Sequence, residues 1–393
     1  MTNYPQIRIR HKEELRLLGG HLWAFSNELL DLPRDLPPGT VVKLVRDRDG
    51  TPVGNGFYHP NSLIAFRLLT RNSDEAVDEA FLEKKIRESA AKRDLLLKWR
   101  NAVRLVHGES DLLPGLIVDK LDSILSFQIT SAGFEAKKEL VTELLQKIFK
   151  PTAIVEKNNS HLRKLEGLPL VEQLVFGSDP VTEIHDAAGT RYAVNVLAGQ
   201  KTGFYLDQME NRARLRDFVH PGARVLDLFT NDGGFALNAA LAGAASVTAV
   251  DESASALGRV DRNAELNDVK EAITTVEANC FDYVREVVDR FDVIILDPPA
   301  LAKSKKDIAQ ARKAYLTLNT QTMRMLSPNG ILVSCSCSHH IDSDELMSII
   351  GEAARRARRT ATVLERRGAG IDHPILASMP ETEYLKVFIL GVH

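Results

Sequence analysis

The chain has 393 residues, 44% of them hydrophobic, so two or three domains with packed cores are expected. No stretch approaches the apolar length of a membrane span, and the N-terminus lacks the apolar core of a secretory signal, which disfavours a membrane partner. A net charge of −3 does not indicate a nucleic-acid binder, and three cysteines without a disulfide framework favour the reducing cytoplasm.

The first 75 residues are predicted to form short strands and turns. Strands are expected over 41–45, 52–58 and 64–69, which together predict a small β-barrel. This region has ten Lys/Arg against nine Asp/Glu, so its charge alone does not predict RNA binding. Aromatic and basic side chains are candidate RNA contacts, although the two aromatic ones suit a core equally well: Arg8, Arg10, His11, Trp23 and Phe25.

A predicted helix over 74–99 leads into a basic run. Residues 83–104 hold eight Lys/Arg and three Asp/Glu. A solvated helix face is the plain interpretation of such a run, and contact with an RNA backbone is the alternative.

The remaining chain mixes strands and helices in two different patterns. Strands over 116–118 and 124–129 and a helix over 135–149 predict a central α+β domain. From residue 194 onward, strands over 224–228, 246–250, 292–296 and 331–335 alternate with helical patterns, which predicts a parallel, doubly wound sheet. The predicted domains are therefore 1–75, 76–190 and 191–393.

Three segments of the last domain predict a nucleotide-like cofactor. In an open α/β sheet, ligands bind beyond the carboxyl ends of the strands, where the strand order reverses. Gly233 and Gly234 follow one strand, permit close backbone approach and begin a helix whose N–H groups can meet a carboxylate. Asp251 closes the next strand, where it can accept both ribose hydroxyls. Asp297, followed by two prolines, is not expected in a dehydrogenase, so S-adenosylmethionine (SAM) and methyl transfer are favoured.

The resemblance to a known family becomes specific over several motifs: 199–212 (GQKTGFYLDQMENR), 227–240 (DLFTNDGGFALNAA), 296–305 (LDPPALAKSK) and 334–338 (SCSCS). Together they resemble the PUA-domain-containing SAM-dependent methyltransferases that make 5-methylcytosine in large-subunit ribosomal RNA. The similarity extends to 104–119 (RLVHGESDLLPGLIVD), 372–374 (DHP) and 384–386 (YLK), and so covers nearly the whole chain.

The resemblance implies the architecture and the partners. It implies an N-terminal PUA β-barrel that binds RNA, a central α+β domain and a Rossmann-like, doubly wound SAM-methyltransferase domain, which together form an α/β chain. Large-subunit ribosomal RNA is the implied partner. Family members are often homodimers, although no segment here stands out as dimer-forming.

By the same resemblance, a set of residues would line the SAM pocket: Gln200, Phe204, Asp207, Gln208, Arg212, Phe229, Asn231, Gly233, Gly234, Asp251, Asn279 and Asp297. Two positions depart from the family pattern. Asn231 and Asp232 replace an aromatic residue and Thr, and Asp232 would repel the cofactor's carboxylate unless it points outward or caps the helix. Asn279 replaces an Asp expected at the adenine amino group, but its amide oxygen can still accept that hydrogen bond.

Methylation of cytosine at carbon 5 requires covalent activation, because that carbon is a poor nucleophile. Cys337 matches the family's nucleophile, and Asp297 is the expected donor or orienter at ring nitrogen 3. Cys335 is a decoy, a helper or simply buried. A zinc site using Cys335, Cys337, His339 and His340 would match no common ligand spacing.

Three other functions remain open at this point. An RNA guanine-N2 methyltransferase would need Asp297 and Pro298 but no cysteine. A non-catalytic RNA-binding or ribosome-assembly protein with a vestigial fold is favoured only by Asp232 and Asn279. A nicotinamide oxidoreductase fits least, because of the Asp-Pro-Pro motif.

Overall fold

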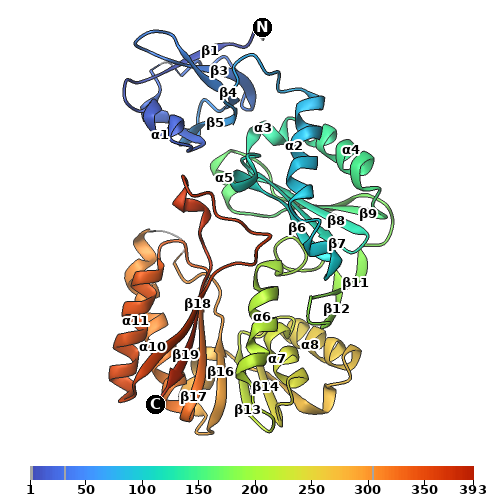
Figure 1. The fold of residues 1–393 in the computed structure, drawn as a ribbon, viewed down its shortest axis with the longest axis vertical. Coiled ribbons are helices and arrows are strands. Elements are labelled where there is room, and N and C mark those ends of the chain that lie inside the picture. The colour runs from blue at the N-terminus through green and yellow to red at the C-terminus, as the bar shows by residue number, and fades with distance from the viewer. Residues whose placement is uncertain (1–2, 31, 303–304) are drawn as a thin grey trace. The chain divides into compact units, whose positions relative to one another are not determined.

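The computed structural model describes residues 3–30, 32–302 and 305–393 (Figure 1), so residues 303 and 304 of the 296–305 motif lie outside the described chain. The chain divides into two compact units. Unit 1 comprises Met1–Ile184, Val194–Leu206 and Asp372–Thr382, and unit 2 comprises His185–Ala193, Asp207–Ile371 and Glu383–His393. The strands β11 (Val181–His185) and β12 (Arg191–Asn195) form a separate two-stranded sheet.

The first sheet of unit 1 contains the strands predicted for the N-terminal region. Its order is β1-β3-β4-β5-β2, formed by β1 (Gln6–Ile9), β3 (Thr40–Arg46), β4 (Pro52–Tyr58), β5 (Ile64–Thr70) and β2 (Trp23–Phe25). Only β1 and β3 pair in parallel, and α1 (Glu14–Leu18) packs against β4. Alternate apolar side chains, among them Ile9, Leu44 and Phe66, point into one buried core.

The second sheet of unit 1 has the order β10-β9-β8-β7-β6. It consists of β6 (Ala102–His107), β7 (Leu116–Leu121), β8 (Ile124–Ile129), β9 (Ala153–Asn158) and β10 (Val171–Phe176). Helices α3 (Ala132–Glu135) and α4 (Lys138–Phe149) lead from β8 to the parallel neighbour β9, and α5 (Leu162–Leu165) follows. The predicted helix over 74–99 is too long, because α2 (Glu79–Ala91) begins only after Asp78, which caps it.

Three arginines of the basic run are buried, which corrects the expectation of a solvated or RNA-binding face for these three only, since Lys84, Arg87, Lys92 and Lys98 are exposed. Arg93 binds Asp111 through two nitrogens at 2.8 and 2.7 Å. Arg104 forms a similar bidentate pair with Asp119 at 2.8 and 2.9 Å. Arg100 is 3% exposed and pairs with a carboxylate from residue 372. The partners lie elsewhere in the chain, so these arginines stabilise unit 1 and are not available to RNA.

Unit 2 is built on a seven-stranded sheet of order β15-β14-β13-β16-β17-β19-β18. Its strands are β13 (Arg224–Leu228), β14 (Ser246–Asp251), β15 (Ile273–Glu277), β16 (Phe291–Leu296), β17 (Leu326–Ser336), β18 (Ala361–Arg367) and β19 (Lys386–Val392). All neighbours are parallel except β19, which is antiparallel to both β17 and β18. The predicted strand at 224–228 is confirmed, and the other three predicted strands lie within β14, β16 and β17.

Helices cover both faces of this sheet (Figure 1). One face packs against α9 (Cys280–Glu286), α10 (Ile308–Met325) and α11 (Ser343–Ala357), through sheet residues such as Leu226, Ile294 and Leu332. The other face packs against α7 (Gly234–Leu241) and α8 (Ala254–Leu266), and α6 (Met209–Leu215) packs on α7. In the sheet, β14 lies on one side of β13 and β16, which follows later in the chain, lies on the other side. The strand order therefore reverses between β13 and β16, where a ligand is expected.

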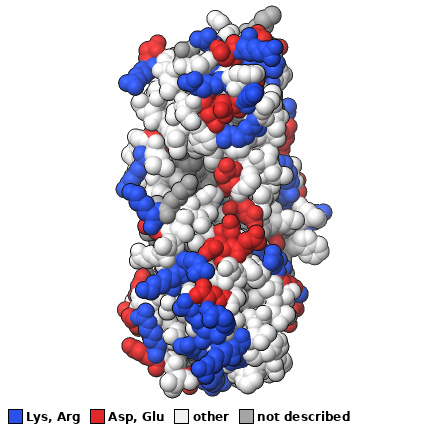
Figure 2. All heavy atoms as spheres, turned by 90° about the vertical axis from the view of Figure 1, so that its left-hand side faces the viewer, with Lys and Arg blue, Asp and Glu red and all other residues white. Residues whose placement is uncertain are grey.

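Basic side chains gather over the face of unit 2 that carries α10 and α11 (Figure 2). Arg355, Arg356 and Arg358 are exposed at the C-terminal end of α11, and Arg356 pairs with Glu352 on the same helix. Since α11 connects β17 to the parallel β18, its C-terminal end lies at the edge where the strands begin. The positive charge there complements the helix dipole and lies opposite the ligand edge. Over the described residues, no helix is long and apolar enough to cross a membrane.

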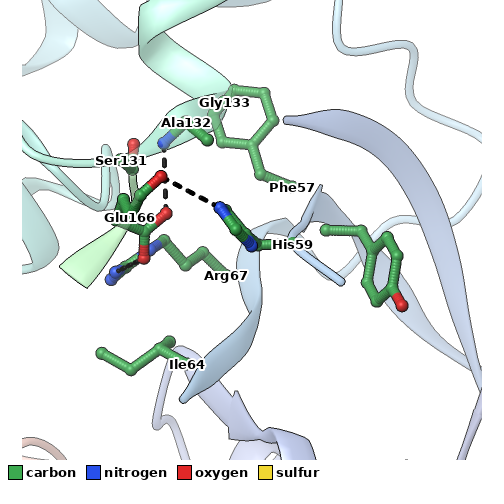
Figure 3. Close-up of a pocket in the computed structure, with 9 residues that line it drawn as sticks. Phe57, His59, Ile64, Arg67, Ser131, Ala132, Gly133 and Glu166 are labelled. Carbon is green, nitrogen blue, oxygen red and sulfur yellow. Dashed lines mark hydrogen bonds and ion pairs between the residues drawn. The ribbon is translucent and has the colours of Figure 1, made fainter. Parts of the chain in front are cut away.

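A small enclosed pocket in unit 1 marks the junction of its two sheets (Figure 3). Glu166 lies at its centre and accepts hydrogen bonds at 2.8 Å from both Arg67 and Ser62 and at 3.2 Å from the amide of Ala132. His59 contacts the carbonyl oxygen of Glu166 at 3.1 Å. The cavity volume is about 10 Å³, room for a single water, so the pocket is a structural joint and not a ligand site.

Candidate functional site

Four strand ends of unit 2 converge at the reversal point of the sheet. Phe229 follows β13, Asp251 ends β14, Asp297 follows β16, and Cys337 follows β17. Because these strands are parallel neighbours, their carboxyl ends meet at one edge. The predicted residues that lie in unit 2 are therefore brought to one region by the topology of the sheet.

The loop after β13 is tightly folded, with three residues in left-handed backbone conformations. Phe229 has φ 61°, Asn231 has φ 49° and Gly233 has φ 79°. Asp227, at the end of β13, holds this loop by accepting from the Thr230 hydroxyl at 2.6 Å and from the first turn of α7 at 3.0 Å. A non-glycine residue at positive φ is uncommon and costs free energy, so the loop needs this anchoring.

Asp227 is the site residue that sequence reasoning did not assign. It is 1% exposed, and burial raises its pKa to about 7, with the nearby charge of Asp297 adding to the rise. Hydrogen bonds from Thr230 and the amide of Ala236 act in the opposite direction, as does the charge of Arg212. The only signal in the sequence was its position as the last polar residue of a buried strand, which does not distinguish a loop anchor from a ligand contact.

The two glycines have different neighbours. A Cβ at Gly234 would lie 2.3 Å from Arg212 Nε, so this glycine makes room for the arginine side chain. A Cβ at Gly233 would approach Val260 at 3.0 Å, and its positive φ also favours glycine. Arg212 in turn lies over the ring of Phe235 at 6.0 Å. The sequence predicted close approach of a cofactor here, and the structure adds a close approach of Arg212.

The carboxylate of Asp251 is oriented by two backbone amides. Asn231 donates to Oδ2 and Ser253 donates to Oδ1, each at 3.0 Å. A carboxylate offers about four acceptor sites, so two remain for a pair of hydroxyl groups. This geometry fits the predicted binding of a ribose.

Asp232 does not face the ligand edge with an unbalanced charge. Its carboxylate forms an ion pair with Arg259 Nε from α8, and the same guanidinium donates to Asn231 Oδ1 at 3.3 Å. Asn263 also donates to the Asp232 carbonyl at 3.1 Å. Helix capping or an outward orientation of Asp232 was expected. In the structure its charge is instead balanced by Arg259, a cation on a helix 27 residues further along the chain.

Asn279 is the N-cap of α9. Its amide oxygen accepts from the Phe281 N–H at 2.9 Å, and its amide nitrogen donates to Glu252 at 3.4 Å. The predicted hydrogen bond to adenine would therefore use the second lone pair of an oxygen that already caps a helix. Phe281 also meets Phe229 edge to face at 6.0 Å. The two aromatic rings form an apolar wall beside this predicted adenine position.

Asp297 is held by a chain of hydrogen bonds. Gln208 donates to its Oδ2 at 3.0 Å, and Asn211 donates to Gln208 Oε1 at 2.7 Å. Asp207, the residue before Gln208, accepts separately from the Tyr384 hydroxyl at 2.7 Å. Two of the predicted residues, Gln208 and Asp297, thus belong to one chain of hydrogen bonds, and a third, Asp207, is held by a different partner.

Burial separates the three cysteines, all of which lie in the described chain. Cys280 and Cys335 are buried, at 3% and 0% exposure, and burial raises the pKa of both thiols. Cys337 is half-buried, and its thiol approaches the Pro298 carbonyl oxygen at 4.0 Å. Of the two cysteines in the 334–338 motif, only Cys337 is partly exposed, and its thiol adjoins the Asp-Pro-Pro segment.

Two predicted cofactor residues, Gln200 and Phe204, belong to unit 1. Phe204 is 2% exposed. Between them, the Thr202 hydroxyl donates to Asp119, the same carboxylate that binds Arg104. Just before them, Lys157 donates to the carbonyl oxygens of residues 197 and 199. The segment carrying Gln200 and Phe204 is therefore anchored by buried charged groups of the central sheet.

The residues of unit 2 fit the predicted cofactor. No side chain caps α7 within the described chain, so its first N–H groups, apart from that of Ala236, remain available for a carboxylate. Asp251 has free acceptor sites for hydroxyl groups, and Phe229 and Phe281 offer an apolar wall. These are the recognition groups that the carboxylate, ribose and base of SAM require.

Comparison with known proteins agrees with the fold. Residues 7–71 match the PUA-like domain family, and residues 172–377 match the S-adenosylmethionine-dependent methyltransferase family. The ribosomal RNA large subunit methyltransferase I of Shewanella amazonensis is 37% identical over 98% of this chain and 99% of its own length. The protein of the same name from Salmonella arizonae is 35% identical over 99% and 98%.

A solved structure shares the fold over almost the whole chain. It is described as a candidate methyltransferase complexed with SAH, and it superposes with a TM-score of 0.85 at 21% identity, covering 98% of this chain and 100% of that one. The predicted fold class, a PUA-like β domain followed by a Rossmann-like SAM-methyltransferase domain, is confirmed.

Proposed function

The chain belongs to the ribosomal RNA large subunit methyltransferase I family of SAM-dependent methyltransferases, and from that premise we propose that it methylates carbon 5 of a cytosine in 23S ribosomal RNA. S-adenosylmethionine is its methyl donor. The single observation that supports the cytosine-C5 assignment is the half-buried Cys337 beside the Asp-Pro-Pro segment, while Cys335 is fully buried.

In the proposed reaction, Cys337 is the nucleophile. Its thiolate adds to carbon 6 of the cytosine, and the bonding electrons make carbon 5 able to take the methyl group, which bound SAM supplies. A base then removes the carbon-5 proton, and the electrons of that C–H bond restore the double bond and expel the thiolate. The products are 5-methylcytosine, S-adenosylhomocysteine, the protonated base and the regenerated cysteine.

We assign Asp297 the role of holding the base. Its carboxyl group follows β16, next to the proline whose carbonyl oxygen approaches Cys337. Gln208 fixes its Oδ2, and the carboxyl group, when protonated, would donate to ring nitrogen 3 of the cytosine. A base inside a duplex cannot reach this position, so the target nucleotide must leave its stack at a cost of a few kcal/mol.

We propose which part of SAM each predicted residue of unit 2 would bind. Asp251 would hold the ribose, the loop at Phe229 and Asn231 with Gly233 and Gly234 would lie under the methionine part, and Asn279 would meet the adenine. We propose that Asp207, Gln208 and Arg212 complete the pocket from the side of α6. The assignment of Gln200 and Phe204 to SAM binding is a proposal that rests on the family resemblance.

The partner and the compartment follow from the same family membership. We propose large-subunit ribosomal RNA as the substrate, bound through the PUA-like domain, and the cytoplasm as the compartment. A three-domain division at 1–75, 76–190 and 191–393 and a homodimer remain proposals; limited proteolysis and analytical ultracentrifugation would test them.

Transfer of labelled methyl from SAM to unmodified ribosomal RNA tests the function. Wild-type protein should place label in 5-methylcytidine, and Cys337→Ala should lose it, whereas Cys335→Ala, the matched control from the same motif, should keep it. Label in a methylguanosine that survives Cys337→Ala would favour a guanine-N2 methyltransferase. Absence of both label and SAM binding would favour a non-catalytic RNA-binding protein.

A further inference from the structure

The 384–386 motif (YLK) near the C-terminus lies at the start of β19 and contacts both sides of the site. Tyr384 donates its hydroxyl to Asp207 at 2.7 Å, on the side of the predicted cofactor residues. Two residues later, Lys386 pairs in register with Ser336, the last residue of β17. Cys337 is the next residue of the chain, so the motif contacts both Asp207 and the neighbourhood of the nucleophile.

Lys386 is a buried cation, which is uncommon unless the charge has a specific partner. It is 4% exposed, and its ammonium donates to the Ser338 carbonyl at 2.7 Å and to the Tyr384 carbonyl at 2.8 Å. An ammonium has three N–H donors. Two neutral carbonyls use two of them and balance no charge, so the pair of hydrogen bonds does not by itself explain a buried lysine.

The charged groups around Lys386 include the proposed nucleophile. Burial lowers the pKa of Lys386 to about 8, and the negative charge of a Cys337 thiolate opposes that shift, ahead of Glu383 and Asp342. Cys337 is also in the neighbourhood of Asp297, because its thiol approaches the carbonyl oxygen of the next residue, Pro298, at 4.0 Å, and the charges of Cys337 and Asp297 both raise the pKa of Tyr315. A carboxylate beside a thiol disfavours the thiolate, so the site needs a nearby cation.

We propose that Lys386 is a positioning residue that places its ammonium beside Cys337 and favours the thiolate form of the sulfur. The proposal rests on the proposed function only in that Cys337 is the nucleophile. The hydrogen bond from Lys386 to the Ser338 carbonyl also fixes the turn that carries the cysteine. Ser338 is itself held in place, because its hydroxyl accepts from the amide of Leu301 at 2.9 Å.

The proposal accounts for why Cys337 is activated and Cys335 is not. A free cysteine has a pKa of roughly 8.5, so only a small fraction is thiolate at neutral pH. Cys335 is enclosed within β17, where burial raises its pKa well above the ordinary value. Cys337 follows the strand, is half-buried, and interacts with a cation from the neighbouring antiparallel strand.

The test is the pH dependence of alkylation of Cys337 by iodoacetamide, followed by peptide mass spectrometry on the full chain. The midpoint in the wild-type protein should lie below the ordinary cysteine value. Lys386→Met should raise the midpoint by about one pH unit, which lowers the alkylation rate at pH 7 about tenfold. Lys386→Arg should restore most of the rate, and Lys313→Met, an exposed lysine on α10, should leave it unchanged.

Two outcomes would overturn the proposal: a wild-type midpoint at or above about 8.5, or the same midpoint in wild-type protein and Lys386→Met. The first outcome is measured on wild-type protein, so it does not depend on whether a variant folds. Alkylation of Cys337→Ala gives the background signal from the other two cysteines. SAM binding by calorimetry should be unchanged in Lys386→Arg. Because alkylation requires no RNA, this test is separate from the methyl-transfer assay, in which full activity of Cys337→Ala would refute the proposed function instead.

Discussion

Replacing Asp227 by Asn should make unit 2 more stable at neutral pH, although it alters a residue that anchors the site loop. Burial raises the pKa of Asp227 from 3.8 to about 7. A folded state with the higher pKa binds more protons than the unfolded chain, so the stability contributed by this carboxyl is complete below about pH 4 and is lost progressively as the pH rises to about 7. Asn stays neutral and keeps one acceptor oxygen, so it does not lose this stability.

The magnitude follows from the size of the pKa difference. About three pKa units at 1.36 kcal/mol each give about 4 kcal/mol between pH 4 and pH 7. Both hydrogen bonds to this side chain go to Oδ2, so the amide oxygen of Asn can accept them. Asp227→Asn should therefore be close to wild type at pH 4 and more stable by about 4 kcal/mol at pH 7.5.

The assay is urea unfolding at several pH values, read by pulsed hydrogen exchange and mass spectrometry of peptides from 224–241. Subtracting the wild-type free energy of unfolding from that of the variant removes the titration of all other groups. Asp282→Asn, whose side chain is 62% exposed, is the matched control and should give a flat difference. A flat difference for Asp227→Asn as well would refute the argument that burial dominates this carboxyl.

Three further substitutions test the charged pairs and the second cysteine. Arg104→Met should destabilise unit 1 by about 3–5 kcal/mol, because Asp119 is left charged and buried, and adding Asp119→Asn should recover part of the loss. Fluorescence of the two tryptophans, both in unit 1, would report it. Arg259→Gln should weaken SAM binding in calorimetry about tenfold by freeing the charge of Asp232, and Asp232→Asn should reverse the effect. Cys335→Ala should lower the free energy of unfolding in urea by about 1 kcal/mol, because Cys335 is buried. It should leave methyl transfer within about threefold, and a complete loss of transfer would contradict the assignment of Cys335 as a buried residue without a catalytic role.

The sequence alone determined the features that depend on neighbouring residues. The alternation of apolar strands and helices predicted the parallel sheet of unit 2, and β3, β4 and β5 lie where the N-terminal pattern placed them. The order of the strands then brought Asp251, Asp297 and Cys337 to the same edge, since parallel neighbours end together. Local periodicity and strand ends are therefore enough to locate the site, because each is encoded within a few consecutive residues.

Only the tertiary structure decided what each side chain there does. Arg259 balances Asp232 from 27 residues away, and Lys386 reaches the turn of Cys337 from a strand near the C-terminus. Arg93, Arg100 and Arg104 of the basic run are buried because they pair with carboxylates outside the run. The two cysteines of one motif differ only in burial, which depends on the packing of the whole sheet. Partners distant in sequence set charge, burial and pKa, and no local pattern records them.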